Sequence, residues 1–266
     1  MGEEAADIGD LLPPGHAPVG ETVALPPMQR MAAAHLLKSQ EITAPVTIMG
    51  EADAQGLVDL REELTPQDSV TDGQHISLTH LIIARVASAL RRHPKLNAAR
   101  TGNSLQIYGQ INIAIALALP DGNLIVPVIK DADTLTIGQI ADAVADLRQR
   151  GEAGKLGLDD VRGATFTVTN AGMVPCTRWT TPIIPIGQTA ILGVGSVRRV
   201  PVVKDDAVVP GWVLPLSLTF DHCAINGYPA SEFLEDLAAF IANPKRPAAS
   251  KNSQQAKSDQ STRGQA

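Results

Sequence analysis

His222 is the residue of this sequence whose position best allows acid–base chemistry. It follows residues 214–221, where apolar side chains alternate as they do in a strand, and it precedes a turn that contains Cys223 and Asn226. An imidazole can take up or release a proton near neutral pH, and the end of a rigid strand holds such a group in place. The position permits general-base catalysis, although a histidine at a strand end is more often a hydrogen-bonded structural residue.

Neither the neighbouring cysteine nor the other histidines indicate a second kind of site. Cys223 directly follows His222, and adjacent side chains of an extended chain point to opposite faces, which disfavours a thiolate–imidazole pair. The six histidines include no pair with the spacing of helical metal ligands, and Cys176 is distant from Cys223 in the sequence. We therefore expect no metal.

The composition is typical of a soluble domain with a sizeable core and an acidic surface. The 266 residues are 44% apolar, and 28 acidic against 22 basic side chains give a net charge of −6. This balance disfavours nucleic acid and anionic membranes as partners. The uncharged run over residues 179–197 is interrupted by prolines and glycine, so no membrane span is expected. With two cysteines and no basic residue before Arg30, a cytoplasmic protein is expected.

Two kinds of hydrophobic periodicity alternate along the chain and predict an α/β fold. Apolar residues recur with helical spacing over residues 77–93, 136–150 and 231–243. Thr136 and Gln139 have capping-box spacing, and Gly151 stands where a helix commonly ends. Strands are expected over residues 111–119, 124–129, 165–170, 190–195 and 214–221, with a turn at residues 120–122. The mixed order implies a sheet that is at least partly antiparallel, and it places His222 at the end of the last strand.

The two ends of the sequence differ in composition from the segment between them. Residues 1–24 contain five acidic side chains and no basic one, together with prolines and glycines, which predicts a flexible N-terminal arm. Residues 245–266 are rich in glutamine, serine and basic residues, which predicts a disordered C-terminal tail. A single domain over residues 25–244 is expected between them.

A series of short motifs within residues 25–244 supports a more specific prediction. The series includes Asn112-Ile113-Ala114-Ile115-Ala116, Leu124-Ile125-Val126-Pro127-Val128-Ile129, Thr165-Phe166-Thr167-Val168-Thr169-Asn170-Ala171-Gly172-Met173 and Asp221-His222. In these motifs the chain resembles the catalytic domain of the dihydrolipoamide acyltransferases of 2-oxo acid dehydrogenase complexes. That family shares its fold with chloramphenicol acetyltransferase. The resemblance implies an α/β, chloramphenicol acetyltransferase-like fold, in which a mixed sheet has flanking helices and the chains form trimers.

The resemblance also implies an activity, the transfer of an acyl group between the thiols of coenzyme A and dihydrolipoamide without a metal. The family's catalytic histidine corresponds to His222, which is expected to remove the proton from the attacking thiol. The family's hydroxyl residue corresponds to Thr169, which is expected to stabilise the oxyanion that forms on the thioester. In this fold the site lies between subunits, so we expect a homotrimer or a larger multiple of three. No residues that bind coenzyme A are predicted.

Three positions depart from the family's pattern. The family has aspartate four residues after the histidine, where this chain has Asn226, and arginine directly after the histidine, where this chain has Cys223. Gln29 stands where the family's N-terminal helix has arginine. We expect an amide pair of Gln29 and Asn226 to hold the catalytic loop in place of an ion pair. Asn226 is therefore counted with His222 and Thr169 as a site residue.

The source of the lipoyl group is expected to be another protein. The chain contains no Asp-Lys-Ala lipoylation motif and too few residues before Leu25 for a lipoyl domain, so the lipoyl group is expected in trans. A separate lipoyl protein and 2-oxo acid dehydrogenase subunits are the expected partners. Two alternatives stay open: a catalytically inactive structural core subunit of such a complex, for which Asn226 is the main argument, and a transferase to a small hydroxyl or amine acceptor.

Overall fold

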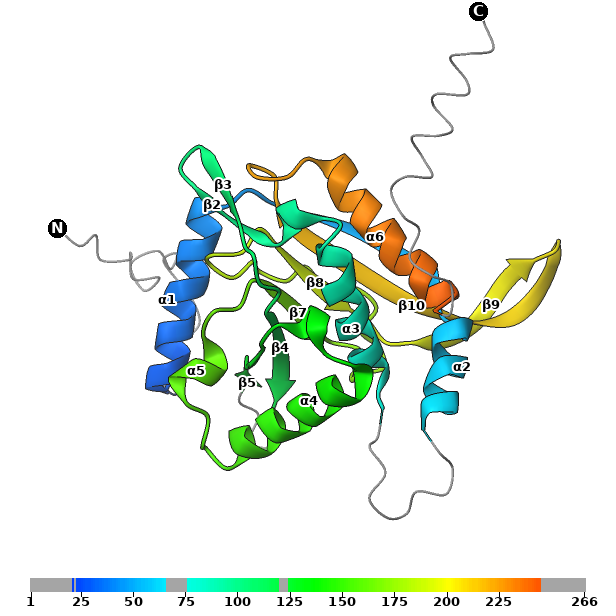
Figure 1. The fold of residues 1–266 in the computed structure, drawn as a ribbon, viewed down its shortest axis with the longest axis horizontal. Coiled ribbons are helices and arrows are strands. Elements are labelled where there is room, and N and C mark those ends of the chain that lie inside the picture. The colour runs from blue at the N-terminus through cyan, green and yellow to red at the C-terminus, as the bar shows by residue number, and fades with distance from the viewer. Residues whose placement is uncertain (1–20, 22, 66–75, 120–123, 245–266) are drawn as a thin grey trace, which may run out of the picture.

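An eight-stranded mixed sheet forms the centre of the computed structural model, which describes residues 21, 23–65, 76–119 and 124–244 (Figure 1). The strands are β1 (Pro45–Asp53), β4 (Ile113–Ala118), β5 (Leu124–Ile125), β6 (Val128–Ile129), β7 (Phe166–Asn170), β8 (Ala190–Val194), β9 (Arg198–Lys204) and β10 (Ala207–Asp221). Their order is β1-β10-β8-β7-β4-β5, with β6 beside β4 and β9 beside β10. The β4–β7 and β7–β8 pairs are parallel and the other pairs are antiparallel. A separate hairpin consists of β2 (Ala98–Thr101) and β3 (Ser104–Ile107).

Helices flank this sheet. They are α1 (Pro27–Ile42), α2 (Gln55–Leu64), α3 (Leu78–Leu90), α4 (Ile137–Glu152), α5 (Leu158–Val161) and α6 (Gly227–Ala242), with short 3₁₀ helices at Pro94–Leu96 and Ala132–Thr134. α6 packs on β1 and β10, α3 packs against α6 and α4, and α1 lies at the edge of the molecule (Figure 1). The predicted fold class, an α/β fold with a partly antiparallel mixed sheet and flanking helices, is confirmed.

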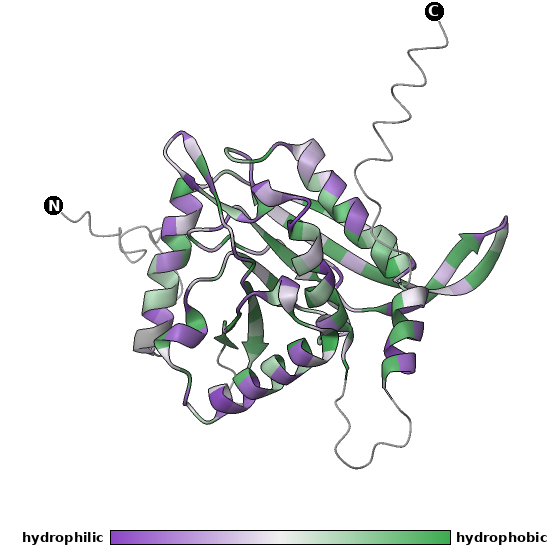
Figure 2. Cartoon of the chain, in the orientation of Figure 1, coloured by the Kyte–Doolittle hydropathy of each residue, from purple (hydrophilic) through white to green (hydrophobic). Residues whose placement is uncertain are grey.

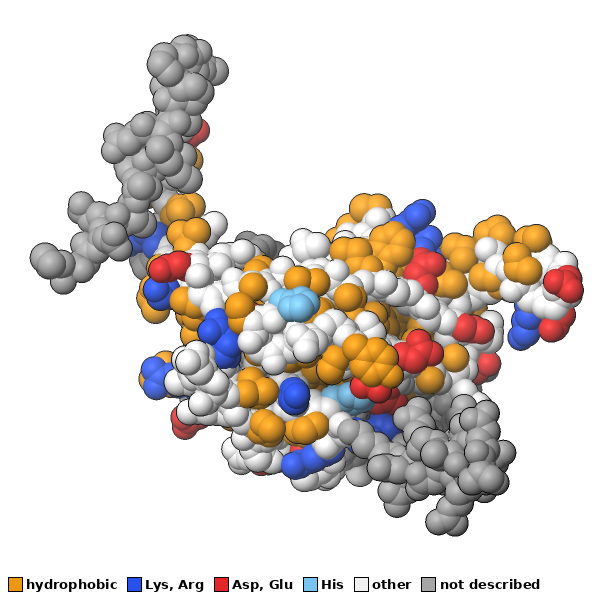
Figure 3. Space-filling view, turned by 90° about the horizontal axis from the view of Figure 1, so that it is seen from above, with side chains coloured by type: hydrophobic (Ala, Val, Ile, Leu, Met, Phe, Trp, Pro, Cys, Tyr) orange, Lys and Arg blue, Asp and Glu red, His pale blue; other side chains and the backbone are white. Residues whose placement is uncertain are grey.

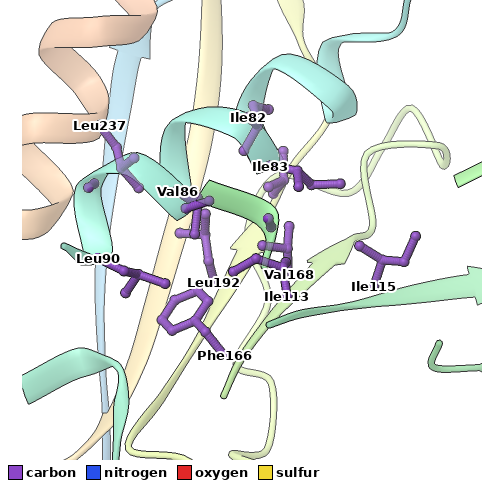
Figure 4. Close-up of a cluster of buried hydrophobic side chains, with 14 of the residues drawn as sticks. Ile82, Ile83, Val86, Leu90, Ile113, Ile115, Phe166, Val168, Leu192 and Leu237 are labelled. Atoms are coloured by element: carbon purple, nitrogen blue, oxygen red, sulfur yellow. The ribbon is translucent and has the colours of Figure 1, made fainter. Parts of the chain in front are cut away.

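The hydrophobic core lies between the helices and one face of the sheet. Successive strand residues point to opposite faces, so every second residue of β7, β8 and β10 faces the helices. Phe166, Val168 and Leu192 are at most 1% exposed and belong to one cluster with Ile83 and Val86 of α3 (Figure 4). Figure 2 shows that hydrophilic and hydrophobic residues alternate around α4.

An ionic cluster joins α3 and the residues after it to α6. Asp236 accepts a hydrogen bond from Arg85 Nη2 at 2.8 Å and another from Arg92, and His93 Nε2 lies 3.6 Å from its Oδ2. Burial acts to raise the pKa of Asp236, but hydrogen bonds from His93 and Arg92 and the charges of both arginines lower it to about 2. The carboxylate is therefore charged at neutral pH and links the two helices.

The face of the sheet away from the core carries hydroxyl side chains. Thr169 is paired with Gly193, and Gly193 with Ser217, so these residues share that face. Thr180, in the segment between β7 and β8, donates its backbone N–H to Ser217 Oγ at 3.3 Å. It lies so close over Gly193 that a Cβ there would collide with the threonine hydroxyl. Helices thus pack on one side of the sheet, and polar groups line part of the other.

The predicted helix α4 begins as expected but ends later. Thr136 Oγ1 accepts from the backbone N–H of Gln139 at 3.3 Å, and Gln139 Oε1 accepts from that of Thr136 at 2.9 Å, which confirms the capping box. The predicted end at Gly151 is wrong, because the helix continues to Glu152 and the glycine with positive φ, 65°, is Gly154. Gly151 is instead a close-packing position, since the Ile125 side chain occupies the space of a Cβ.

Other elements are longer than predicted or are new. α6 begins at Gly227 rather than residue 231, and β10 begins at Ala207 rather than residue 214. The added part of β10 pairs with β9 in a hairpin that projects from the body of the protein (Figure 1). α2, β1 and β9 were not predicted. β1 is an edge strand, and most of its residues are partly or fully exposed, so its apolar alternation is weak.

Two elements expose apolar side chains in the single chain. α1 buries Ser39 but exposes Leu37 and Met31, the latter by 74%. Near the tip of the β9–β10 hairpin, Val203 and Val208 are 75% and 73% exposed. Figure 3 shows hydrophobic side chains along this hairpin, at the right, and over the adjoining surface. Exposed apolar surface of this kind is typical of a region that contacts another molecule.

Some predictions fall on residues outside the described part. These are most of the arm over residues 1–24, the turn at residues 120–122 and the tail over residues 245–266. Among the described helices, none is long and apolar enough to cross a membrane. Within the same residues there is no group of three or more histidine, cysteine, aspartate or glutamate side chains placed to hold a metal ion.

Candidate active site

His222 begins the turn that follows β10, as the sequence predicts. Its backbone N–H donates to the carbonyl of Ala44 at 2.8 Å, which ties the turn to the segment before β1. Its ring centroid lies 5.7 Å from that of Phe220, and the residue is exposed. The backbone is thus held at a strand end while the imidazole stays accessible, as a general base for an incoming substrate must be.

A buried carboxylate directly precedes His222. Asp221 is 2% exposed, and its Oδ1 accepts hydrogen bonds from the backbone N–H groups of Ala44 at 3.0 Å and Cys223 at 3.1 Å. Its Oδ2 accepts from Arg100 Nε, on β2, at 2.8 Å. Burial acts to raise the pKa of Asp221, but the hydrogen bonds from Arg100 and the two amides outweigh it and hold the pKa below its usual range. The charged carboxylate therefore fastens the chain on both sides of His222.

A cavity of about 510 Å³ opens beside this turn. Arg100, Asn103 and Ser104 of the β2–β3 hairpin line one side, and Cys223 and Ala224 line the other. The cavity is open to solvent, and more of its lining is polar than apolar. The sequence predicts no binding residues, so this cavity is a candidate that only the structure provides.

Thr169 lies on β7, on the sheet face that carries the hydroxyl side chains. The adjoining residue fixes the end of the strand. Asn170 Nδ2 donates to Thr79 Oγ1 on α3, and Asn170 Oδ1 accepts from the backbone N–H of Gly172, both at 2.8 Å. Thr169 thus has the firmly held backbone that an oxyanion donor needs.

Thr169 and His222 do not meet within one chain. Thr169 is in register with Gly193 and Gly193 with Ser217, while His222 lies five residues beyond Ser217. The two Cα atoms are separated by two strand spacings of about 4.8 Å across the sheet and by five residues of about 3.3 Å along β10. Together these components give a distance of about 19 Å. An oxyanion donor acts at about 3 Å. The two residues can share a site only if different chains supply them.

Asn226 lies directly before α6, where it is exposed and makes no side-chain capping hydrogen bond to the helix. Its predicted pairing with Gln29 is not observed in the described part of one chain and stays a prediction. Gln29 is near the start of α1, and the 13 residues from there to Ile42 correspond to about 20 Å of helix. The end of α1 at Ile42 is the one that approaches the turn after β10, because Arg100 binds both Ile42 and Asp221. The cation beside the turn is Arg100 instead.

The sequence gives no indication of the Arg100–Asp221 ion pair. Asp221 belongs to the Asp221-His222 motif, so a role for this carboxylate could have been inferred from the motif. Arg100 lies on a short hairpin 121 positions earlier, where no periodicity or spacing marks it. Only the tertiary fold brings the two together.

The fold has its counterparts among acyltransferase domains. The profile of the family described as 2-oxoacid dehydrogenases acyltransferase (catalytic domain) matches residues 18–249. The chain belongs to this family.

The relatives have the same architecture. The dihydrolipoyllysine-residue acetyltransferase component of the acetoin cleaving system of Bacillus subtilis is 32% identical over 217 residues, 82% of this chain and 54% of that protein. The structure of dihydrolipoamide acetyltransferase from Azotobacter vinelandii, solved in an investigation of a catalytic serine, histidine and asparagine, has a TM-score of 0.79 and 30% identity, covering 88% of this chain and 98% of that one. The cubic core of a pyruvate dehydrogenase multienzyme complex has a TM-score of 0.79 and 31% identity, with the same coverage of 88% and 98%.

These comparisons confirm the predicted family and the fold of its catalytic domain. The chain spans about half the length of the curated relatives it matches.

Proposed function

We propose that this chain transfers an acyl group between coenzyme A and the thiol of dihydrolipoamide. The observation that carries the proposal is the accessible imidazole of His222, held at the end of β10 by the hydrogen bond from its backbone N–H to Ala44. The names of the relatives describe acetyl transfer to a dihydrolipoyllysine residue, which supports the same chemistry here.

In the proposed step, the neutral imidazole of His222 takes the proton from the acceptor thiol. The thiolate sulfur attacks the carbonyl carbon of the acyl-CoA thioester, and the carbonyl electron pair moves onto oxygen. When this oxyanion collapses, the bond to the sulfur of coenzyme A breaks, and the leaving thiolate takes the proton back from His222. One thioester replaces another, so the step needs no oxidant, reductant or metal.

Thr169 of a neighbouring chain is the proposed donor to the oxyanion. The separation of about 19 Å between Thr169 and His222 within one chain supports a site shared between subunits. The exposed apolar side chains of α1 and the β9–β10 hairpin supply surface for such contacts. A cubic assembly, as in the pyruvate dehydrogenase core, contains three-fold axes, which supports a trimer or a larger multiple of three.

Asn226 is proposed to belong to the same site. The histidine and asparagine investigated in the Azotobacter vinelandii enzyme are four residues apart, as His222 and Asn226 are here. An asparagine at this position is thus compatible with an active enzyme, which weakens the argument for an inactive core subunit. Its exposed amide can accept or donate a hydrogen bond to a bound substrate.

The acceptor is proposed to be a lipoyl group, because the names of the relatives describe acetyl transfer to a dihydrolipoyllysine residue. The catalytic domain is proposed to span residues 25–244. A lipoyl protein and 2-oxo acid dehydrogenase subunits are the proposed partners.

The test is incubation of the assembled protein with several acyl-CoA species and free dihydrolipoamide, followed by chromatographic measurement of the coenzyme A formed. We expect transfer that falls about 100- to 10,000-fold in His222→Ala. Absence of transfer with every acyl-CoA would favour the inactive core subunit. Transfer only to compounds with hydroxyl or amine groups, in a parallel acceptor screen, would favour the other alternative.

A further inference from the structure

A single guanidinium connects three segments around the turn that carries His222. Arg100 Nε donates to Asp221 Oδ2 at 2.8 Å, and Arg100 Nη2 donates to the carbonyl of Ile42, the last residue of α1. The β2–β3 hairpin, the end of α1 and the end of β10 therefore meet at one side chain. Fixing this guanidinium fixes the relative positions of all three.

Asp221 holds most of the backbone of the turn. Its Oδ1 accepts from the N–H of Cys223 at 3.1 Å, and its backbone carbonyl accepts from Ala224 at 2.9 Å and Ile225 at 3.0 Å. The N–H of His222 itself donates to Ala44, the residue whose N–H binds the same Oδ1. The position of the imidazole thus depends on where this carboxylate lies.

The carboxylate needs its cation. The Asp221 side chain is 3% exposed, and a buried charge is tolerated only when it is paired and hydrogen-bonded. Without Arg100, the carboxylate would take up a proton or draw in water. Either change weakens its hydrogen bonds to the backbone N–H groups of Ala44 and Cys223.

We propose that Arg100 is a positioning residue for the transfer reaction: it anchors Asp221, and through Asp221 the backbone of His222, from the β2–β3 hairpin rather than from within the turn. The inference rests on the proposed function for its activity readout. Arg100 contacts no reacting atom in this role and acts through the placement of the base.

Residue 223 is the alternative place from which such a cation could come. The family has an arginine directly after its histidine, and this chain has Cys223 there. Cys223 lines the same cavity as Arg100, and its N–H already binds Asp221. An arginine introduced at 223 would extend from a backbone that is already hydrogen-bonded to Asp221, into the cavity that Arg100 also lines. The pair of positions offers a rescue experiment.

The experiment compares Arg100→Gln, Arg100→Lys and the double variant Arg100→Gln/Cys223→Arg with the parent chain. Arg150→Gln is the matched control, because Arg150 on α4 also pairs with carboxylates, those of Asp146 and Asp160, away from the turn. For each assembled protein, kcat and KM for acyl-CoA are measured with dihydrolipoamide as acceptor. Amide hydrogen exchange of the peptide over residues 221–226 is followed by mass spectrometry.

We expect Arg100→Gln to lower kcat about 10- to 100-fold while KM changes less than about threefold, since a small misplacement of the base affects the chemical step. Exchange in residues 221–226 should become about tenfold faster. Arg100→Lys, which keeps the charge but loses the planar fork, should lie between parent and Arg100→Gln. The double variant should recover kcat and slow exchange, and Arg150→Gln should match the parent in both.

Parental kcat in Arg100→Gln, or lost kcat with unchanged exchange, would overturn the positioning role. If Arg100→Gln folds but the added Cys223→Arg change does not restore its kcat, an arginine at 223 cannot replace Arg100 as the partner of Asp221. If Arg100→Gln does not fold, Arg100→Lys decides: parental exchange and kcat in that variant contradict the proposal. A parent protein that transfers no acyl group contradicts the proposed function alone, because the exchange measurements still test Arg100.

Discussion

A shared site between chains leads to a quantitative prediction for mixtures of two inactive variants. His222→Ala removes the base and should lower kcat about 100- to 10,000-fold. Thr169→Val removes the hydroxyl but keeps the β-branched shape that suits β7, and should lower kcat about 100- to 1,000-fold. The two residues are about 19 Å apart within one chain, so each variant still carries the intact half that the other lacks.

The expected recovery follows from how the chains are distributed. In trimers assembled at random from equal amounts of the two variants, a site works when one chain supplies an intact His222 and its neighbour an intact Thr169. Each condition is met half of the time, so about one quarter of the sites should be active. The mixture should therefore reach about one quarter of the parental rate, far above either variant alone.

The assay is co-refolding or co-expression of the two variants, followed by measurement of acyl transfer from acyl-CoA to dihydrolipoamide. Parent chains mixed with the double variant His222→Ala/Thr169→Val are the control. They should give about one quarter of the fully parental rate if the site is shared, and about one half if each chain has its own site. A mixture of the single variants that is no more active than the variants themselves would refute the shared site.

Three further outcomes are expected. Asp236→Asn should lower the free energy of unfolding at pH 7 by on the order of 2 kcal/mol, because the folded pKa of Asp236 is about 2 and that of an unfolded aspartate is near 4. Denaturant titrations should show this difference between variant and parent shrinking as the pH falls from about 5 toward about 2. Leu192→Ala, at a core position that is 0% exposed, should cost about 2–5 kcal/mol in thermal unfolding, and a loss below about 1 kcal/mol would contradict the packing described. Light scattering should give three chains or a multiple of three, with activity falling when dilution separates them; a fully active monomer would exclude the shared site.

Local signals were enough to predict the elements that position the histidine. The apolar alternation over residues 214–221 follows from burial of one face of β10 against the helices, and this pattern places His222 at a strand end. The capping box of Thr136 and Gln139 involves residues three apart, so it can be recognised without any tertiary information. The same is true of the short motifs that resemble the acyltransferase family.

The boundaries of helices and strands depended on tertiary contacts that the local sequence pattern does not contain. Gly151 resembles a helix end in sequence, but the Ile125 side chain packs against it and the helix continues toward Gly154. The first part of β10 pairs with β9 outside the core, where both faces of the hairpin are partly exposed and the alternation disappears. Hydrophobic periodicity reports burial, so it is silent where a strand is not buried.

The arrangement of the site was decided by tertiary structure alone. Asp221 and Arg100 are 121 positions apart, and a hydrogen bond over that separation follows from the way the β2–β3 hairpin folds over the end of β10. The register from Thr169 through Gly193 to Ser217 likewise determines that Thr169 and His222 lie far apart in one chain. Residue types and short motifs identify which groups can do chemistry, because those properties are local. Which groups meet depends on strand order and register, which arise only when distant segments pack together.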